Sequence, residues 1–259
     1  MSKFFQAKAF LQYWLEAVDA HSLHAPFLFD FYTKVIRQKS VLGETENIEA
    51  LRNGYLRNTQ ILTLQDPGSG STVLRGSSRM ISAIARTSVS PRKFSLLYNR
   101  IIAYTRAQKI LELGTSLGIN TLYLARGTTQ VTTCEGSPEI AQLARKTFAA
   151  AGAQNINLVE GNVDTTLPAL LQNAGKLDFI FLDANHRYAA TLKYFTWLLN
   201  HIHDRSILIV DDIHASPEMQ DAWDAIRRHS LVYASADLFR CGIVFFDPSL
   251  NKQHVVLSF

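Results

Sequence analysis

The sequence is poor in cysteine. Only Cys134 and Cys241 occur among 259 residues, and two thiols are too few for the disulfide framework of a secreted protein. Both lie in apolar runs typical of strands. The cysteine content therefore favours a reducing compartment, and we expect a cytoplasmic protein.

Long apolar runs are also lacking. No stretch reaches the roughly 18 residues that span a bilayer, and the first residues contain no apolar segment with a small-residue cleavage site. Glycine and proline are few, 13 and 7, while 47% of the residues are hydrophobic. This composition excludes collagen-like and low-complexity chains and predicts a globular protein with no membrane span.

Charge of one sign does not dominate, but it is unevenly distributed. Residues 1–100 contain 13 Lys and Arg against 7 Asp and Glu, and residues 101–259 contain 13 against 15. The basic residues of the first part are scattered without a run, which is typical of a solvated surface. Nucleic acid is therefore not favoured as a partner.

The first 89 residues are predicted to be mainly helical. Within residues 4–20, one helical stripe is formed by Phe4, Leu11, Trp14, Leu15 and Val18, so we expect an amphipathic helix whose stripe packs into the core. A membrane-surface role for this helix is the alternative, disfavoured because Lys and Arg do not dominate its polar face. Further helices are predicted over residues 26–38, 44–58, 80–87 and 91–106.

Residues 66–78 read DPGSGSTVLRGSS. Glycine, proline and serine at this density indicate a mobile loop, which we expect to become ordered when a ligand binds. We therefore predict a helical cap with this loop over residues 1–89, on the substrate side, and a catalytic domain over residues 90–259.

From Lys109 onward, short β-rich runs alternate with helical segments. This alternation predicts an α/β protein with a doubly wound, mostly parallel sheet. The last two runs are joined by little more than Arg240, so they must form an antiparallel pair. The runs are KILELG, QVTTCEG, INLVEG, LDFIFLDA, SILIVDDI, LVYASADLF and CGIVFFDP.

The first of these strands ends in a turn with two glycines, Gly114 and Gly118. Glycine lets the backbone approach a ligand closely. The spacing G-x-x-x-G differs from the dinucleotide fingerprint G-x-G-x-x-G, which argues against NAD. Glu112, two residues before the turn, suits a ligand bearing an amine, such as the aminocarboxypropyl end of S-adenosylmethionine.

The next two strand ends also carry polar residues. Glu135 lies about 20 residues after the glycine turn, where a carboxylate can accept hydrogen bonds from both hydroxyls of a ribose. The third strand ends in Gly161-Asn162-Val163, which could meet an adenine ring edge. A ligand of the S-adenosylmethionine type is therefore expected at the carboxyl ends of these strands.

The order of these residues resembles the class I S-adenosylmethionine-dependent methyltransferases. The stretch SPRKFSLLYNRIIAYTRAQKILELGTSLGINTLYLA is similar to the catechol O-methyltransferase-like branch, which has a helix directly before an E-x-G-x-x-x-G turn. The resemblance covers about residues 90–247. It implies a Rossmann-like fold with a seven-stranded sheet, S-adenosylmethionine as cofactor and O-methylation of a small phenolic acceptor. The cofactor-binding residues that we expect are Glu112, Gly114, Thr115, Ser116, Gly118, Asn120, Glu135, Gly136, Ser137, Asn162, Val163 and Asp183.

The resemblance also suggests a metal site. The metal-dependent members bind a divalent ion through an Asp after the fourth strand and an Asp-Asn pair after the fifth, and the matching positions are Asp183, Asp211 and Asp212. Three neighbouring carboxylates repel one another unless a hard cation such as Mg²⁺ neutralises them. Asp212 departs from the Asn of that branch, and an aspartate here could instead cap the helix predicted over residues 215–228.

His186 is the predicted general base. It lies where the catechol-type enzymes carry a lysine, within a D-x-x-H-x-Y pattern like that of a related group of methyltransferases. An imidazole with its ordinary pKa near 6.5 can accept a hydroxyl proton at neutral pH. The alternatives are that His186 caps the next helix or holds Asp183, and that it acts without any metal.

Other histidines are weaker candidates. His214 follows the fifth strand and could contact the acceptor. Metal binding is not expected for His21, His24, His201 or His203, which lack zinc-site spacing. An RNA methyltransferase and a non-catalytic S-adenosylmethionine-binding module remain alternatives to a small-molecule enzyme, and a homodimer is possible.

Overall fold

The computed structural model describes residues 3–38, 45–64, 78–127 and 129–259. By their internal contacts, the residues group into two compact units. We call residues 39–173 the central unit, and residues 1–38 with 174–259 the terminal unit. Each is described by itself. The domain border predicted near residue 89 stays a prediction.

Three strands of the central unit, β3 to β5, are parallel. Strand β3 (Lys109–Leu113) pairs with β4 (Gln130–Glu135), which pairs with β5 (Ile156–Glu160). Helices α6 (Ile119–Leu124) and α7 (Pro138–Ala150) connect them. In this register Leu113 lies opposite Cys134, and Glu135 lies opposite Glu160. The carboxyl ends of all three strands, and the residues that follow them, therefore lie at one edge.

Four further helices belong mainly to the central unit. They are α3 (Glu46–Arg57), α4 (Ile81–Ser88), α5 (Arg92–Thr105) and α8 (Val163–Ala174), and strands β1 (Ile61–Thr63) and β2 (Ser78–Met80) form a small antiparallel pair. Helices α3, α4 and α5 begin and end within two residues of the predicted bounds, and α8 was not among the predicted helices. The predicted mobile loop lies outside the described residues, except for Ser78, which begins β2.

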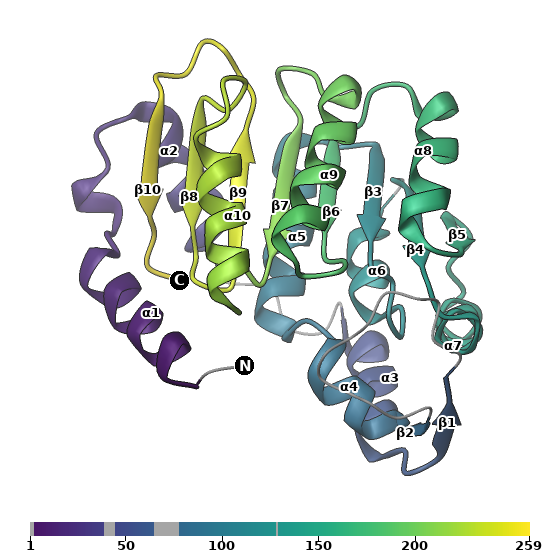
Figure 1. Ribbon diagram of the computed structural model, residues 1–259. Helices are drawn as coiled ribbons and strands as arrows, with labels where there is room; N and C mark the ends of the chain where they lie inside the picture. Colours follow the sequence, from purple (N-terminus) through teal and green to yellow (C-terminus); the bar gives the residue numbers. More distant parts are fainter. Residues whose placement is uncertain (1–2, 39–44, 65–77, 128) are drawn as a thin grey trace. The chain divides into compact units, whose positions relative to one another are not determined.

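The sheet of the terminal unit is mixed. Strand β6 (Phe179–Leu182) is parallel to β7 (Ile207–Asp211), and β9 (Cys241–Phe245) is antiparallel to both β7 and β8 (Ala234–Asp237). Every residue of these four strands is buried, which explains why they read as nearly continuous apolar runs. Helices α9 (Tyr188–Leu198) and α10 (Pro217–Arg227) lie side by side against them (Figure 1).

The expected α/β class with a mostly parallel sheet is confirmed. So is the antiparallel pair at its end, β8 and β9. The expectation of seven strands was short by one, because β10 (Gln253–Val256) adds a parallel strand beside β8.

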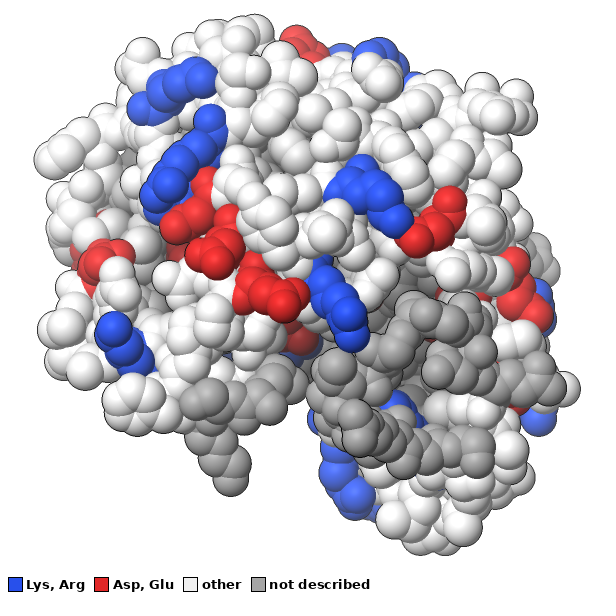
Figure 2. All heavy atoms as spheres, viewed as in Figure 1, with Lys and Arg blue, Asp and Glu red and all other residues white. Residues whose placement is uncertain are grey.

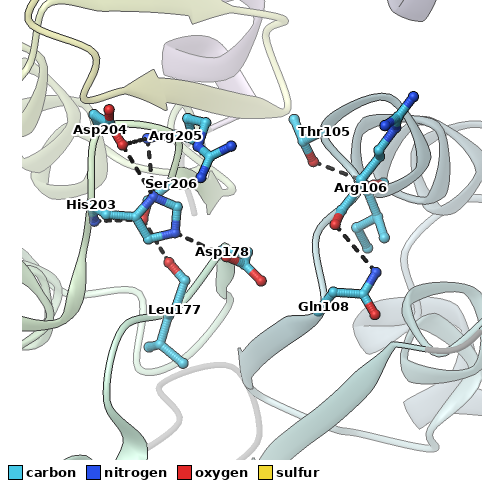
Figure 3. Close-up of polar contacts among 10 residues, drawn as sticks. Thr105, Arg106, Gln108, Leu177, Asp178, His203, Asp204, Arg205 and Ser206 are labelled. Atoms are coloured by element: carbon cyan, nitrogen blue, oxygen red, sulfur yellow. Dashed lines mark hydrogen bonds and ion pairs between the residues drawn. The ribbon is translucent and has the colours of Figure 1, made fainter.

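The amino ends of β6 and β7 are tied together by side chains (Figure 3). The His203 Nε2 atom lies 2.9 Å from Asp178 Oδ1, and the Ser206 hydroxyl donates to the Leu177 carbonyl at 2.6 Å. A short 3-10 turn, η3 (Leu199–His201), comes before this cluster, and His201 Nδ1 lies 2.9 Å from the Gly175 carbonyl. His201 and His203 therefore have structural partners at this end of the sheet.

Helix α1 (Lys3–Glu16) forms, but it ends four residues before the predicted end at residue 20, and Val18 instead forms a β-bridge to Leu257. Its buried face was also predicted wrongly. Phe4, Leu11, Trp14 and Leu15 are exposed rather than packed in the core. The residues that face the terminal unit include Ala9, which is buried, and Tyr13, whose hydroxyl donates to the Leu257 carbonyl at 2.7 Å. The chain continues through η1 (Ala20–Ser22), α2 (Pro26–Phe31) and the π-helical turn η2 (Tyr32–Ile36).

Candidate active site

The turn after β3 has a strained backbone. Gly114 and Gly118 have φ angles of 104° and 78°, and Ser116 between them has 50°. The N–H groups of Gly114 and Thr115 donate to the Cys134 carbonyl at 3.0 and 3.1 Å, which fixes the turn beside β4. A Cβ atom on Gly118 would lie 2.6 Å from Cε1 of Phe148. Glycine at position 118 is thus required both by conformation and by packing.

Glu112 is completely buried beneath this turn. Its Oε1 atom accepts from Asn120 Nδ2 at 2.9 Å, and its Oε2 atom accepts from the hydroxyls of Thr121 and Thr133 at 2.5 and 2.7 Å. These bonds tie the first turn of α6 to β3 and β4. Glu112 therefore has a structural role, and its predicted contact with a ligand amine stays a prediction.

Two other predicted residues are drawn into the same network. The Thr115 hydroxyl lies 2.6 Å from that of Thr133. The side-chain oxygen Oδ1 of Asn120 is buried with no hydrogen-bond partner among the described residues. A buried amide oxygen in this state is costly. It marks a place where a ligand or water could donate a hydrogen bond.

Glu135 is the best-oriented carboxylate of the central unit. Its Oε2 atom accepts from the Ser116 N–H at 2.8 Å, and its Oε1 atom accepts from the Ser137 N–H at 3.0 Å. Each carboxylate oxygen can accept a further hydrogen bond. Glu135 is half-buried, so the two backbone donors hold a charged group that is still accessible.

The remaining predicted residues of the central unit form helix caps. Ser137 caps α7 by accepting from the Ile140 N–H at 3.4 Å, and Gly136 precedes it. The Asn162 side chain accepts from the Asp164 N–H at 2.9 Å, at the beginning of α8, and Val163 is the first residue of that helix. The structure thus brings Ser116, Glu135 and Ser137 together, while Asn162 and Val163 remain predicted ligand contacts.

The terminal unit holds a separate group of charged residues after β6 and β7. The His186 Nε2 atom lies 3.3 Å from Asp183 Oδ1. One ligand atom from each of Asp183, His186 and Asp212 lies within 4.8 Å of the others. His186 and Asp212 have positive φ angles of 31° and 53°, and such strain in bulky residues clusters at functional sites.

Asp211, which belongs to the predicted metal set, is not among these three residues, and its part in binding a metal stays a prediction. It is fully buried, and Arg240 Nη2 donates to its Oδ2 atom at 2.7 Å. The same nitrogen lies 3.6 Å from Asp212 Oδ1. Sequence reasoning missed Arg240, although the antiparallel register that places Asp211 opposite Cys241 brings the preceding residue close.

Two proposed capping roles are also excluded. Ser216, rather than Asp212, caps α10 by accepting from the Met219 N–H at 3.2 Å. Helix α9 begins after Arg187 and has no side-chain cap, so His186 caps nothing. His186 instead holds Asp183, as one of the alternatives predicted.

The electrostatics of the cluster show an excess of negative charge. Burial, together with the charges of Asp183 and Asp212, raises the pKa of Asp211, although Arg240 lowers it. Burial also raises the pKa of Asp212. For His186, burial lowers the pKa. The hydrogen bond to Asp183 and the charges of Asp183, Asp212 and Asp211 outweigh this effect and raise the pKa to about 9.

This result corrects one assumption. An imidazole with an ordinary pKa near 6.5 was expected, whereas His186 in the ion-free protein keeps its proton at neutral pH. The carboxylates of Asp183 and Asp212 and the imidazole of His186 lie close together, and the negative charge of the carboxylates favours binding of a cation. The donor set therefore fits a divalent cation, which would compete with the His186 proton.

His214 has a partner of its own. Its Nε2 atom lies 2.8 Å from Asp237 Oδ2, and its ring stacks on Phe239 with centroids 5.5 Å apart. Its Nδ1 atom is buried without a hydrogen-bond partner among the described residues. The predicted contact of His214 with the acceptor stays a prediction.

Residues 111–213 match the family described as "Methyltransferase domain". The chain is 28% identical over 152 residues to a catechol O-methyltransferase of Mycobacterium tuberculosis, covering 57% of this chain and 66% of that protein. It is 30% identical over 131 residues to a catechol O-methyltransferase of Niastella koreensis, covering 49% and 58%. The chain is thus similar to catechol O-methyltransferases over about half of its length. It spans slightly less than two thirds of the length of these curated relatives.

Solved structures of O-methyltransferases share the fold of this chain. An O-methyltransferase from Bacillus cereus in complex with SAH superimposes with a TM-score of 0.57 at 17% identity, covering 85% of this chain and 97% of the other. TomG from Streptomyces achromogenes, an O-methyltransferase involved in tomaymycin synthesis and solved in complex with SAM, gives 0.56 at 17% identity, covering 80% and 100%.

On the face drawn in Figure 2, lysine and arginine side chains of the described residues are scattered, and they form no broad basic patch on that face. A basic stripe would be the expected footprint of RNA binding. Within the described part of the chain, no helix combines the length and apolar character needed to cross a membrane.

Proposed function

We propose that this protein transfers the methyl group of S-adenosylmethionine to a hydroxyl oxygen of a small phenolic acceptor, in the cytoplasm. The observation that carries the proposal is the Glu135 carboxylate, fixed by the N–H groups of Ser116 and Ser137 beside the glycine turn. A carboxylate in this place suits the two ribose hydroxyls of the cofactor. The names of the relatives, catechol O-methyltransferases, support a phenolic acceptor.

In this proposal Gly114, Ser116 and Glu135 would hold the donor, and the backbone of the glycine turn would bind its aminocarboxypropyl end. Asp183 and His186 of the terminal unit bind and orient the acceptor. Residues 1–89 contribute the acceptor-side cap in this proposal.

The reaction is an in-line displacement. The acceptor oxygen forms a bond to the methyl carbon while the carbon–sulfur bond breaks. The electron pair of the broken bond stays on the sulfur, which gives S-adenosylhomocysteine. Because the sulfonium is already activated, the main contribution of the protein is to hold both partners in line and to accept a proton. His186 can take the hydroxyl proton only when its imidazole is neutral. Its pKa of about 9 in the ion-free protein means that it must first lose a proton at neutral pH.

A divalent cation fits this proposal. Asp183, His186 and Asp212 would hold it, and its chemistry would be to lower the pKa of the acceptor hydroxyl. Arg240 donates to Asp211 and fixes that carboxylate beside the cluster. Asp183 and Asp212 would then orient the acceptor oxygen from two neighbouring strand ends.

Calorimetry and a product assay together test the proposal. We expect S-adenosylmethionine to bind in a calorimetric titration and mass spectrometry to detect a catechol or related phenol that gains one methyl group. Binding without transfer to any phenol would favour a non-catalytic binding module. Transfer to RNA but not to phenols would replace the acceptor class.

A further inference from the structure

The outward face of α1 carries an apolar row that nothing in the described structure covers. Phe4, Leu11 and Trp14 are 81%, 56% and 65% exposed, and Ala7 between them is also exposed. Single exposed apolar residues are common, but a contiguous row marks an interaction surface. We call Phe4, Ala7, Leu11 and Trp14 the α1 seam.

The helix that carries the seam is firmly attached to the terminal unit by its opposite face. Gln6 Nε2 donates to the Ala215 carbonyl at 3.4 Å, and Val18 forms a bridge to Leu257 just after the helix. The rings of Phe10 and Tyr13 contact Phe239, with centroids 5.1 and 5.5 Å apart. The seam is therefore presented to solvent by a packed helix, not by a frayed end.

The spacing of the seam selects a helix as its partner. Its members are separated by three, four and three residues, which is the a/d pattern of a coiled-coil interface with period 3.5. A membrane-surface helix carries mainly basic residues on its polar side. On α1 the exposed polar side of the described residues is formed by Lys8, Gln12 and Glu16, of which Gln12 bonds to Glu16 at 3.0 Å.

The seam is complementary to itself when two helices run antiparallel. With residue numbers that sum to 18, Phe4 faces the partner's Trp14 and Ala7 faces the partner's Leu11, so each layer pairs a larger side chain with a smaller one. No charged residue belongs to the seam, and no charge would lose its solvent inside such an interface. Phe10 and Leu15, 52% and 69% exposed, flank it.

The area suits a dimer of moderate affinity. A fully covered aromatic side chain contributes about 150–250 Å². The exposed parts of the seam and its flanking residues would bury on the order of 600 Å² per copy, or about 1,200 Å² in total, which is the lower limit of a specific interface. Such a dimer is expected to dissociate on dilution.

We propose that two copies of this chain associate through an antiparallel pair of α1 helices, with the α1 seam as the interface. This inference does not depend on the proposed methyl transfer. The contact is isologous, since each helix offers the same surface to the other, so the assembly closes at two copies.

Sedimentation velocity over about 1 to 100 µM protein tests the interface. We expect a shift from monomer to dimer with rising concentration, and Leu11→Glu should raise the dissociation constant at least tenfold by burying charge in the seam. Leu231→Glu is the matched control, because Leu231 is an exposed leucine of the same unit outside α1. It should leave the dimer unchanged. Thermal melts of both variants verify folding.

Cysteine cross-linking tests the antiparallel register. Both native cysteines are buried, so an introduced thiol is the reactive one. An equal mixture of Ala7→Cys and Leu11→Cys chains should oxidise to a mixed dimer, faster than either variant forms a dimer with itself. Rapid self-linking of Leu11→Cys would indicate a parallel pair and contradict the proposal. A monomer at all concentrations would overturn it, whether or not α1 then binds lipid vesicles.

Discussion

At the residue scale, Glu112 on β3 and Glu135 at the end of β4 have opposite environments. Glu112 is enclosed and accepts from three side chains, whereas Glu135 accepts from two backbone N–H groups and remains half-buried. Both carboxylates are held by donors at short distances. Only Glu135 combines that fixation with access to a ligand, and it is therefore the residue whose replacement should affect binding most directly.

Glu135→Ala should weaken S-adenosylmethionine binding by about 1.5–3 kcal/mol, the range for hydrogen bonds to a charged group. Calorimetric titration measures the change. Glu46→Ala is the control, since Glu46 is an exposed glutamate in the first turn of α3. Equal affinity of the two variants would show that the cofactor does not bind at Glu135.

Gly118→Ala should lower the free energy of unfolding by about 1–3 kcal/mol, because φ of 78° is unfavourable for alanine and its Cβ would collide with Phe148. Urea unfolding measures this loss. Gly54→Ala provides the contrast: a Cβ at this position within α3 meets nothing within 4 Å, and alanine should stabilise the helix by about 0.5–1 kcal/mol. A stable Gly118→Ala variant would contradict the account of the turn.

The sequence could locate candidate site residues that directly follow a strand. It could not predict the interactions between charged groups on different strands. Asp183, Glu135 and the glycine turn could be located because strand ends of a parallel sheet meet at one edge. Arg240 and the raised pKa of His186 could not, since both depend on which neighbouring groups are buried together. A pKa is a property of the surroundings rather than of the residue type.

At the element scale, β4 contains a thiol that we expect to be inert. Burial, with the nearby charges of Glu112 and Glu135, raises the pKa of Cys134 to about 12. Because the thiolate is the reactive form, the folded protein should not react with a thiol reagent at position 134 between pH 7 and 9, while the unfolded protein should. Peptide mapping after alkylation checks this. Modification of the native protein at Cys134 would mean that β4 opens locally.

Helix α1 shows what periodicity can and cannot predict. The spacing of its apolar residues predicted a helix and correctly grouped Phe4, Leu11, Trp14 and Leu15 on one stripe. It could not say what lies against that stripe, and the structure leaves the stripe exposed while Tyr13 and Ala9 face inward. Contact with another element is decided by the whole fold, so the buried face of an amphipathic helix is the least certain part of such a prediction.

At the scale of the whole molecule, the alternation of strands and helices was enough to predict the class, the parallel strands and the antiparallel pair. Strand β10 was missed because its four residues, partly exposed at the edge beside β8, carry no strong apolar pattern. The division into a central and a terminal unit also has no signal in composition. It follows from contacts between residues 1–38 and the last third of the chain.

The carboxylate cluster should make the stability of the ion-free protein fall as pH rises. Burial and neighbouring charge raise the pKa values of Asp211 and Asp212, so the folded state holds protons that the unfolded state releases above pH 4. The raised pKa of His186, about 9, acts in the same direction: its contribution is present below pH 6.5 and lost as pH approaches 9. Thermal melts with a chelator should show a midpoint several degrees lower at pH 8.5 than at pH 5.5.

A divalent cation should reverse that loss. Added Mn²⁺ or Mg²⁺ should stabilise the protein more at pH 8.5 than at pH 5.5, because binding requires deprotonated ligands. Asp212→Asn removes a ligand charge and should reduce this stabilisation, while Asp221→Asn on α10 should not. A cation effect that is the same in all three proteins would place the ion elsewhere.

The central claim is transfer of a methyl group from S-adenosylmethionine to a phenolic oxygen, and one measurement tests it most directly. The protein is incubated with methyl-deuterated S-adenosylmethionine, a divalent cation and a panel of catechols and monophenols, and the products are identified by mass spectrometry. We predict a phenol carrying one deuterated methyl on oxygen, with the rate strongly reduced by chelator and by Glu135→Ala. S-adenosylmethionine that binds tightly but yields no O-methylated product, with or without the cation, would contradict the account.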